Sequence, residues 1–435
     1  MNSKIQLLLS FTLLTHNCGK YPSGNISDPR VILISIDGLN GDMMESYFFR
    51  DSCPNLYHLM QSGTYCSNVQ SVFPSLTYPA HTSMISGKLP EKHGILNNKL
   101  FLPEKNFSDW YWFEDSIKTE TIVTKANKKG LISLGVSWPV TVGSDFDYLL
   151  PEIQSVNDSI STIDLVRKYD NPKMFLESAK IRGIIPEDGN PDGYHRDLLI
   201  HEVFLDAFSN KLPHLSLYHM IETDLAQHNH GKNSIEAKKA FMFMDSLIGN
   251  ITNLLKEKHL WDSTTIIISG DHGFRNYETQ LSINKFFEDC GWLEIKDDKI
   301  INWKVSALAS GGSAFVRLKD PENETFRKKV RIALSKQEGF EILEPRHMES
   351  IFWTSKQTDF ILIAKEKYVF VQSLGQPYKK DDFGGTHGGD PRKKSLKTGY
   401  IAAGRGIKKG KIKALMITDI AYQISTLLDL ELDQN

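Results

Sequence analysis

A hydroxyl side chain in a proline-rich turn is the first candidate for chemistry in this sequence. Thr77 lies between Pro74 and Pro79, and residues 80–87 are typical of a helix that begins just after the turn. The free N–H groups at a helix N-terminus attract anions such as phosphate. Metal coordination can deprotonate a threonine hydroxyl and make it a nucleophile, and the sequence shows no neighbouring general base that would clearly do so. A lone threonine in such a turn is more often a cap.

Aspartate and histidine residues that could bind metal ions lie before this turn and far beyond it. They are Asp37, Asp224, His228, Asp271, His272 and His387. Residues 224 and 228 have the four-residue spacing that puts two side chains on one face of a helix. A mixture of carboxylate and imidazole ligands favours zinc over magnesium alone. Taken singly, these residues also fit a turn, a surface pair or a flexible loop, so the hypothesis depends on their ordered combination.

Short apolar runs rich in β-branched residues end at or shortly before three of these aspartates. The runs are 31–36, 215–218 and 264–269. Helical patterns at 53–62 and 235–256 lie between them. Alternating strands and helices favour a parallel sheet, in which functional residues gather at the carboxyl ends of the strands. We therefore predict an α/β fold with a mostly parallel central sheet flanked by helices.

The region from about 281 to 375 has a different pattern, with short candidate strands and charged connectors. We interpret it as a smaller lobe inserted into a catalytic domain that spans residues 31–435.

The formal net charge of the 435-residue chain is −2, which excludes a global basic field for nucleic acid. Four cysteines do not build a disulfide scaffold. Cys53 and Cys66 could pair, or they could remain two half-buried thiols.

The N-terminus is typical of an export signal. Lys4 precedes a short apolar run at 5–14, which is too short to span a bilayer, so we predict a signal over residues 1–18. Cys18 could carry lipid, as in a bacterial lipoprotein, although simple secretion fits as well. Residues 19–30 are typical of a flexible tether. The expected location is periplasmic, cell-surface or extracellular.

Six ordered motifs give the chain a family resemblance. They are Ile36-Asp37-Gly38, the segment 73–81, the segment 87–95, Glu222-Thr223-Asp224 with His228, the segment 269–273, and Thr386-His387-Gly388. With these motifs the chain resembles the nucleotide pyrophosphatase/phosphodiesterase family of the alkaline phosphatase superfamily, from about residue 31 to 430. The resemblance implies an alkaline-phosphatase-like fold, two zinc ions and cleavage of phosphodiester or pyrophosphate bonds, with nucleotides as one class of substrate.

The same resemblance assigns roles by position. One zinc would be held by Asp224, His228 and His387, and the other by Asp37, Asp271, His272 and Thr77. Thr77 would attack phosphorus and form a phosphothreonine intermediate, which water then hydrolyses. Tyr78 and Trp138 would line the pocket for the leaving group and stack on a base or a lipid chain, although core packing explains them equally well. His81, His93 and His219 are expected to be buried, hydrogen-bonded side chains near the site.

The chain departs from the resemblance at Ala80, where an asparagine is expected to donate a hydrogen bond to the phosphate. This departure leaves two alternatives open. One is a phosphomonoesterase, which needs a lysine or arginine beside the phosphate, and Arg275 is a candidate. The other is a catalytically inactive binding protein at the cell surface.

The expected partner is a small phosphodiester, such as a nucleotide or a lipid head group, and no obligate protein partner is evident.

Overall fold

The computed structural model describes residues 23–156, 160–172, 185–297, 299–343 and 358–433. The predicted signal at 1–18, with Cys18, lies outside these ranges. Near the predicted tether, the Gly24 N–H donates to the Lys211 carbonyl at 2.9 Å, and Arg30, only 1% exposed, begins the first strand. The tether over residues 19–30 stays a prediction. Among the described residues, no helix combines the length and the apolar character needed to cross a membrane.

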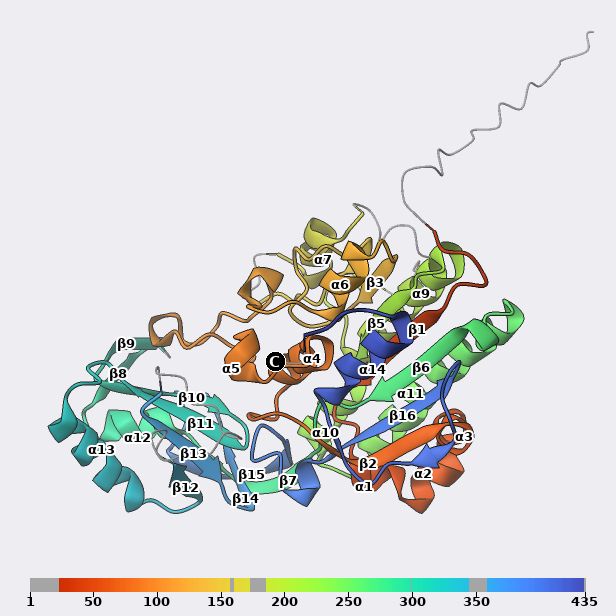
Figure 1. Cartoon of the computed structure of the whole chain (residues 1–435). Coiled ribbons are helices and arrows are strands. Elements are labelled where there is room, and N and C mark those ends of the chain that lie inside the picture. The colour runs from red at the N-terminus through yellow and green to blue at the C-terminus, as the bar shows by residue number, and fades with distance from the viewer. Residues whose placement is uncertain (1–22, 157–159, 173–184, 298, 344–357, 434–435) are drawn as a thin grey trace, which may run out of the picture.

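A large sheet forms the centre of the molecule (Figure 1). Within the described residues it has nine strands, in the order β17-β2-β16-β6-β1-β5-β3-β4, with β18 beside β2. Strands β6, β1, β5, β3 and β4 pair in parallel, whereas β16 runs antiparallel to both neighbours. This confirms the predicted mostly parallel sheet. The bounds are β1 Arg30–Ile36, β2 Thr64–Gln70, β3 Ser133–Val136, β4 Tyr148–Leu150, β5 Leu215–Met220, β6 Thr264–Ser269, β16 Thr398–Gly404, β17 Gly410–Lys411 and β18 Leu415–Met416.

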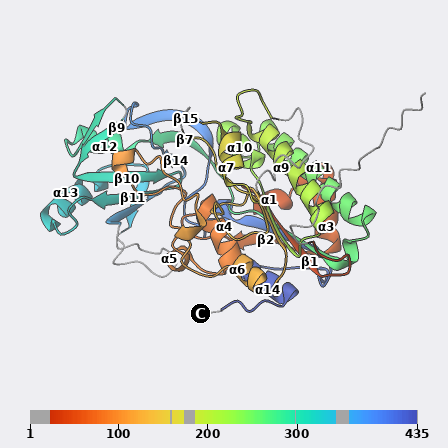
Figure 2. The ribbon, with the colours of Figure 1, turned by 90° about the horizontal axis from the view of Figure 1, so that it is seen from above.

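Helices cover both faces of this sheet, as the two views show (Figures 1 and 2). Alternate side chains of β1 point to opposite sides, so that Ile32 and Ile34 join one core cluster while Val31 and Leu33 join another. The first cluster lies under α3 (Pro54–Ser62), α9 (Gly193–Lys211) and α11 (Ile235–Glu257). The second lies under α4 (Thr77–Ser86), α6 (Ile122–Lys128) and α14 (Asp419–Leu428). Shorter helices are α1 Gly41–Met44, α2 Tyr47–Ser52, α5 Pro90–His93, α7 Thr162–Tyr169 and α10 Glu222–His230.

The two cysteines that could pair do not form a disulfide. Both are buried free thiols. Cys53 belongs to the first core cluster and Cys66 to the second, so the sheet separates them. The thiol interpretation of these residues is therefore the correct one.

A second group of strands and helices lies to one side of the main sheet (Figure 1). Its four-stranded sheet has the order β10-β11-β13-β12, and its side chains form a separate core cluster. A three-stranded sheet, β14-β7-β15, adjoins it. The predicted lobe boundaries at about 281 and 375 stay a prediction. The elements are β7 Arg275–Leu281, α12 Ile283–Asp289, β8 Leu293–Lys296, β9 Lys299–Trp303, β10 Val305–Ser310, β11 Ser313–Leu318, α13 Glu324–Ser335, β12 Phe340–Leu343, β13 Phe360–Ala364, β14 Lys367–Phe370 and β15 Lys379–Thr386.

Candidate metal centre

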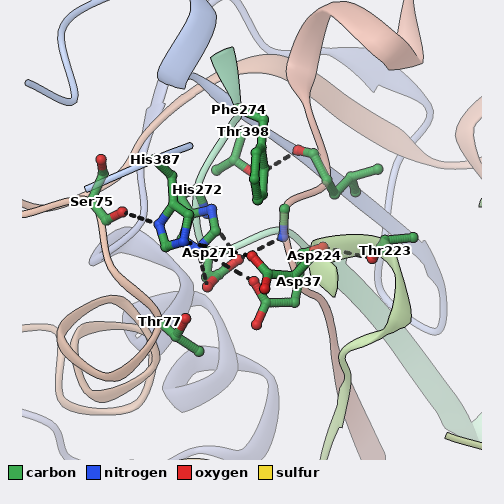
Figure 3. Close-up of polar contacts among 12 residues, drawn as sticks. Asp37, Ser75, Thr77, Thr223, Asp224, Asp271, His272, Phe274, His387 and Thr398 are labelled. Carbon is green, nitrogen blue, oxygen red and sulfur yellow. Dashed lines mark hydrogen bonds and ion pairs between the residues drawn. The ribbon is translucent and has the colours of Figure 1, made fainter. Parts of the chain in front are cut away.

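The structure brings the predicted metal-binding residues together near the carboxyl edge of the central sheet; Figure 3 shows all of them except His228, which lies beside His387 and Asp224. Asp37 directly follows β1, and the pair at 271–272 follows β6. Helix α10 comes straight after β5 and carries two of the residues. His387 comes directly after β15 from the other side, and Thr77 is the first residue of α4. The neighbouring parallel strands β5, β1 and β6 thus collect side chains from distant parts of the sequence at one edge, and His387 joins them from the segment after β15.

Two histidines and one aspartate form the more open part of this centre. The Nε2 atoms of His228 and His387 lie 3.0 Å apart, and Asp224 Oδ1 lies 3.4 Å and 3.6 Å from them, respectively. Each ring donates its Nδ1–H to a backbone carbonyl, that of Gly385 at 3.0 Å or Ser75 at 2.9 Å. Both Nε2 atoms therefore present lone pairs to the same point. Zinc bonds of about 2.0 Å would place tetrahedral ligand atoms about 3.3 Å apart, which matches this spacing.

A second cluster is fully buried beside the first. His272 Nε2 lies 3.3 Å from Asp37 Oδ1 and 3.1 Å from Asp271 Oδ2. The N–H groups of Gly38 and His272 each donate to Asp271 Oδ1 at 3.0 Å, which leaves Oδ2 free to face the cluster. No hydrogen-bond partner among the described residues reaches Asp37 Oδ1, Asp271 Oδ2 or His272 Nε2. Such unpaired buried ligand atoms fit a cation. His272 also stacks on His387 at 3.5 Å, so it joins the two clusters.

With no metal bound, burial favours the neutral forms of these carboxyl groups and imidazoles. It raises the pKa of Asp37 well above its usual value and that of Asp271 to about 7, and repulsion between the carboxylates adds to both shifts. Burial also lowers the pKa of His387 to about 3 and that of His272 well below normal. The imidazoles are thus neutral, as metal ligands must be, and a cation would relieve the crowding of the carboxylates.

The N-terminus of α4 borders the second cluster. The helix begins at Thr77, three residues before the predicted start, because Leu76 takes the N-cap position and a helix tolerates Pro79 in its first turn. His81 Nδ1 contacts the Thr77 carbonyl at 2.7 Å and lies 3.8 Å from Asp271 Oδ2. The Thr77 N–H has no hydrogen-bond partner among the described residues. A hydroxyl and a free N–H therefore meet beside the metal-binding atoms, where a phosphate would be attracted.

Asn98 is a residue of this site that the sequence analysis missed. Its Oδ1 accepts a hydrogen bond from the Tyr78 N–H at 2.9 Å, which holds the amide beside the first turn of α4. Asn98 is a candidate to supply the amide that this chain lacks at position 80, where the family has an asparagine and this sequence has Ala80. Ala80 is fully buried and packs in the second core cluster. The sequence offered one hint of this role, because Asn98 closely follows the segment 87–95, which is one of the family motifs.

The predicted substrate-pocket aromatics are both buried. Tyr78 is 1% exposed and packs against Trp110 and Trp112 at centroid distances of 5.5 Å and 5.8 Å. Trp138 is fully buried with its ring edge-on to His81 at 4.8 Å. This geometry fits core packing, and a contact of either ring with substrate stays a prediction. The expectation that His81, His93 and His219 are buried is confirmed.

Comparison with known proteins decides the family. Residues 31–390 match the family model of type I phosphodiesterase / nucleotide pyrophosphatase. The chain belongs to this family. The resemblance drawn from the six motifs is thereby confirmed.

Named relatives of the phosphodiesterase family are about a quarter identical to this chain over the residues that align. Ectonucleotide pyrophosphatase/phosphodiesterase family member 1 of Homo sapiens is 27% identical over 293 residues, which are 64% of this chain and 27% of that protein. Bis(5'-adenosyl)-triphosphatase ENPP4 of Homo sapiens is 24% identical over 59% of this chain and 50% of that protein. The chain thus spans between a quarter and a half of the length of these relatives. Family member 5 of Homo sapiens is 24% identical over 99% of this chain and 80% of that protein.

Solved structures of the same family share the fold. Human ectonucleotide pyrophosphatase / phosphodiesterase 5 superposes with a TM-score of 0.68 at 18% identity, covering 93% of this chain and 96% of that chain. An inactive murine form of that protein in complex with AMP gives a TM-score of 0.66 at 18% identity, covering 94% and 97%. This likeness confirms the predicted alkaline-phosphatase-like fold.

Proposed function

We propose that this chain is a two-zinc hydrolase that cleaves phosphodiester or pyrophosphate bonds through a phosphothreonine intermediate on Thr77. The observation that carries the proposal is the convergence of unpaired, buried imidazole and carboxylate atoms next to the N-terminus of α4. Membership of the phosphodiesterase family supports it. All proposed nucleophile and ligand positions hold suitable residue types, which argues against an inactive binding protein.

Two zinc ions fit the donor set, and when bound they would lower the pKa of a hydroxyl and offset charge on phosphoryl oxygens. One ion would be held by Asp224, His228 and His387, and the other by Asp37, Asp271, His272 and Thr77. The backbone carbonyls of Gly385 and Ser75 accept from Nδ1 of His228 and His387, which orients the Nε2 atoms of both rings toward the proposed ion. Such outer contacts orient ligands and raise their basicity.

Thr77 and the first turn of α4 carry out the transfer itself. The Thr77 oxygen forms a bond to phosphorus as the bond to the leaving oxygen breaks, so the phosphoryl group remains on Thr77. Water then attacks phosphorus, and Thr77 regains its hydroxyl proton. The Thr77 N–H and the Asn98 amide are placed to donate to a non-bridging oxygen, where charge grows in the transition state.

Nucleotides are the substrate class that we infer first. The relatives are named for nucleotide pyrophosphatase and bis(5'-adenosyl)-triphosphatase activity, and one related structure contains AMP. A diester carries one negative charge on the reacting phosphate, so it does not require an added cation. Arg275, the earlier candidate for such a cation, donates instead to the Tyr368 carbonyl at 2.7 Å. This contact directs the guanidinium toward β14 and favours a diester over a monoester.

The deciding experiment compares hydrolysis of bis(4-nitrophenyl) phosphate and 4-nitrophenyl phosphate by the purified chain with zinc. We expect preference for the diester, and loss of that activity in Thr77→Ala. A preference for the monoester would instead indicate a phosphatase. No hydrolysis of either compound by folded, zinc-loaded protein would contradict the proposal and favour a binding role. Diadenosine triphosphate would then test the nucleotide class.

Export is a further part of the proposal. Names of the relatives carry the prefix "ecto", and the first 18 residues have the pattern of a signal. Lipid attachment at Cys18 would hold the chain at a membrane surface, and cleavage without lipid would release it. Mass spectrometry of the mature N-terminus distinguishes the two, since an acylated Cys18 adds the mass of its fatty chains.

A further inference from the structure

One fully buried histidine contacts the candidate metal centre without belonging to the predicted ligands. His219 lies on β5 and is 0% exposed. Its Nε2 lies 3.1 Å from Asp37 Oδ2, and its Nδ1 donates to the Ser137 carbonyl at 3.1 Å. A hydrogen bond therefore joins Nε2 and Oδ2, whichever of the two atoms carries the proton. His219 is the side chain that connects this aspartate to the loop after β3.

The two oxygens of Asp37 have different surroundings. Oδ1 faces His272 Nε2 at 3.3 Å and has no hydrogen-bond partner among the described residues. Oδ2 faces His219. A carboxylate with one oxygen held in this way cannot rotate freely, so its other oxygen has a fixed direction. We propose that His219 is a positioning residue for Asp37, whose Oδ1 it directs toward the second metal position. This inference rests on the proposed function, because that function places a metal ion there.

His219 is itself a poor candidate for a ligand. The groups of ligand atoms that lie within 4.8 Å of one another contain Asp37, Asp271 and His272, or Asp224, His272 and His387, and among the described residues His219 belongs to neither group. Its ring reaches one carboxylate oxygen only, on the side away from His272. Two donor atoms do not make a zinc site, which takes three or four protein ligands. A contact to the outer oxygen of a ligand is instead the usual place of an orienting partner.

The surroundings hold the His219 ring in this orientation. Ser137, whose carbonyl accepts the Nδ1–H, has a φ of 55°, so its backbone is in the left-handed region. An Nη2–H of Arg196 on α9 donates to the Ser137 hydroxyl at 3.3 Å, which ties this loop to α9. The ring of His81 packs edge-on against His219 at 4.3 Å. Each contact limits rotation of the ring, as positioning of a ligand requires.

Two substitutions separate positioning of Asp37 from support of the Ser137 loop. In His219→Gln the amide reaches the place of Nε2 and can still bond to Asp37, whereas in His219→Asn the shorter amide reaches only the place of Nδ1. The matched control is His201→Gln, because His201 is equally buried but contacts Tyr218 and not the metal centre. The measurements are zinc stoichiometry and affinity by calorimetry on metal-free protein, with kcat and KM for the diester.

For His219→Asn we expect one of two zinc ions to bind about 10–100-fold more weakly. The other ion should be unaffected, and kcat should fall more than KM changes. His219→Gln should recover most of the affinity, and the control should bind zinc as the unchanged chain does. Full affinity in His219→Asn but not in His219→Gln would overturn the proposal in favour of a loop-supporting role. A zinc stoichiometry reduced by one in both would make His219 a ligand, which also overturns it.

Failure of the proposed function has a separate outcome. If the unchanged chain binds no zinc, both proposals fall, whereas two bound ions with indistinguishable variants overturn only the role of His219. If both substitutions prevent folding, ¹⁵N NMR of the histidine rings in the unchanged chain decides. We expect His219 Nε2 to show no bond to metal when zinc is saturating, and a metal-bound Nε2 would overturn the proposal.

Discussion

At the scale of single residues, the proposed role of Thr77 as nucleophile depends on its position at the first turn of α4. Its carbonyl is contacted by His81 at 2.7 Å, and its own N–H remains without a partner among the described residues. Thr77 as a whole residue is only 9% exposed, so little water competes with a substrate for its hydroxyl. A buried hydroxyl at a helix N-terminus beside carboxylates and imidazoles is suited to attack phosphorus only when a cation offsets the local negative charge.

Replacement of Thr77 tests this role directly. We expect Thr77→Ala to lower kcat by at least about 10³-fold, because removal of the nucleophile removes the covalent route. Thr77→Ser keeps a hydroxyl and should retain a measurable part of the activity. Rapid quench with a ³²P-labelled nucleotide checks the intermediate, since label should remain on the unchanged chain and on Thr77→Ser but not on Thr77→Ala. Labelled Thr77→Ala would show that another residue is the nucleophile.

Asn98 offers a second test at this scale. Asn98→Ala removes an amide next to the first turn of α4, and we expect kcat to fall by about 10²–10³-fold, the usual cost of losing one transition-state donor. Asn97→Ala is the matched control, because Asn97 is the adjacent asparagine but donates to Ser310 at 2.7 Å. It should reduce thermal stability more than kcat. Equal kcat values for the two variants would argue against a donor role for Asn98.

Glu152 gives the stability a pH dependence that can be measured. Burial raises its pKa to about 7, while Arg196 at 3.5 Å and Tyr78 oppose the shift. Between its ordinary value near 4.5 and 7 the folded chain therefore binds more protons at this site than the unfolded chain does. The contribution of Glu152 to the free energy of unfolding should fall by roughly 1–3 kcal/mol as pH rises through this window.

Chemical denaturation of metal-free protein at pH 5 and at pH 8 measures this effect. The difference in unfolding free energy should shrink in Glu152→Gln, because an amide does not titrate. Glu104→Gln changes an exposed glutamate and should leave the difference as it is in the unchanged chain. An identical pH dependence in all three chains would show that Glu152 does not cause it.

At the scale of elements, a carboxylate from another helix fixes the N-terminus of α10, which carries two of the proposed metal ligands. Asp197, on α9, is fully buried and accepts hydrogen bonds from the N–H of Ile221 at 3.0 Å and of Glu222 at 2.8 Å. These N–H groups lie at the start of α10, where helix N–H groups lack partners within the helix. Asp197 thereby sets the position of a helix that carries Asp224 and His228 one turn apart.

We expect Asp197→Ala to lower the free energy of unfolding by about 1–3 kcal/mol, because two buried N–H groups lose their acceptor. It should also weaken zinc binding, because α10 loses its fixed start. Asp192→Ala is the control: Asp192 accepts the His195 N–H at 2.8 Å and caps α9, a helix without ligands. The control should lose stability alone, as seen by denaturation and calorimetry. Unchanged zinc affinity in Asp197→Ala would contradict the positioning of α10 by this residue.

The elements were predictable from sequence where local pattern decides. β6 at Thr264–Ser269 matches its predicted bounds because it is one continuous run of β-branched and apolar residues. The amide of Asn98 could not be placed beside Tyr78, because their contact depends on how the chain returns after α4. The burial of Ala80 follows from the rotation of α4 against the sheet. Burial of Tyr78 depends on Trp110 and Trp112, whose packing no local pattern records.

At the scale of the whole molecule, the candidate metal centre joins segments that are far apart in the chain. Ligands come from the ends of β1, β5 and β6 on one side, and from the loop after β15 on the other. The Ser75 carbonyl, just before α4, contacts His387 Nδ1, and the Ser75 hydroxyl donates to the Gly389 carbonyl at 3.2 Å. A bound cation would therefore cross-link the central sheet and the segment that returns from the lobe, so metal binding and folding should be coupled.

Zinc should consequently stabilise the entire chain and not only the site. An ion that binds the folded state alone adds about 2.7 kcal/mol at a concentration 100-fold above its dissociation constant. We expect chelation to abolish diester hydrolysis and lower the unfolding temperature, and zinc to restore both. Magnesium should restore little, because it prefers an octahedral shell of oxygens and His228, His272 and His387 offer nitrogens.

His387→Ala, which removes the ligand supplied by the loop after β15, should abolish most of the zinc-induced stabilisation. If the unfolding temperature of metal-free protein does not respond to zinc while the Thr77-dependent activity persists, the centre works without coupling these segments. The cross-linking argument would then be wrong even though the chemistry is right.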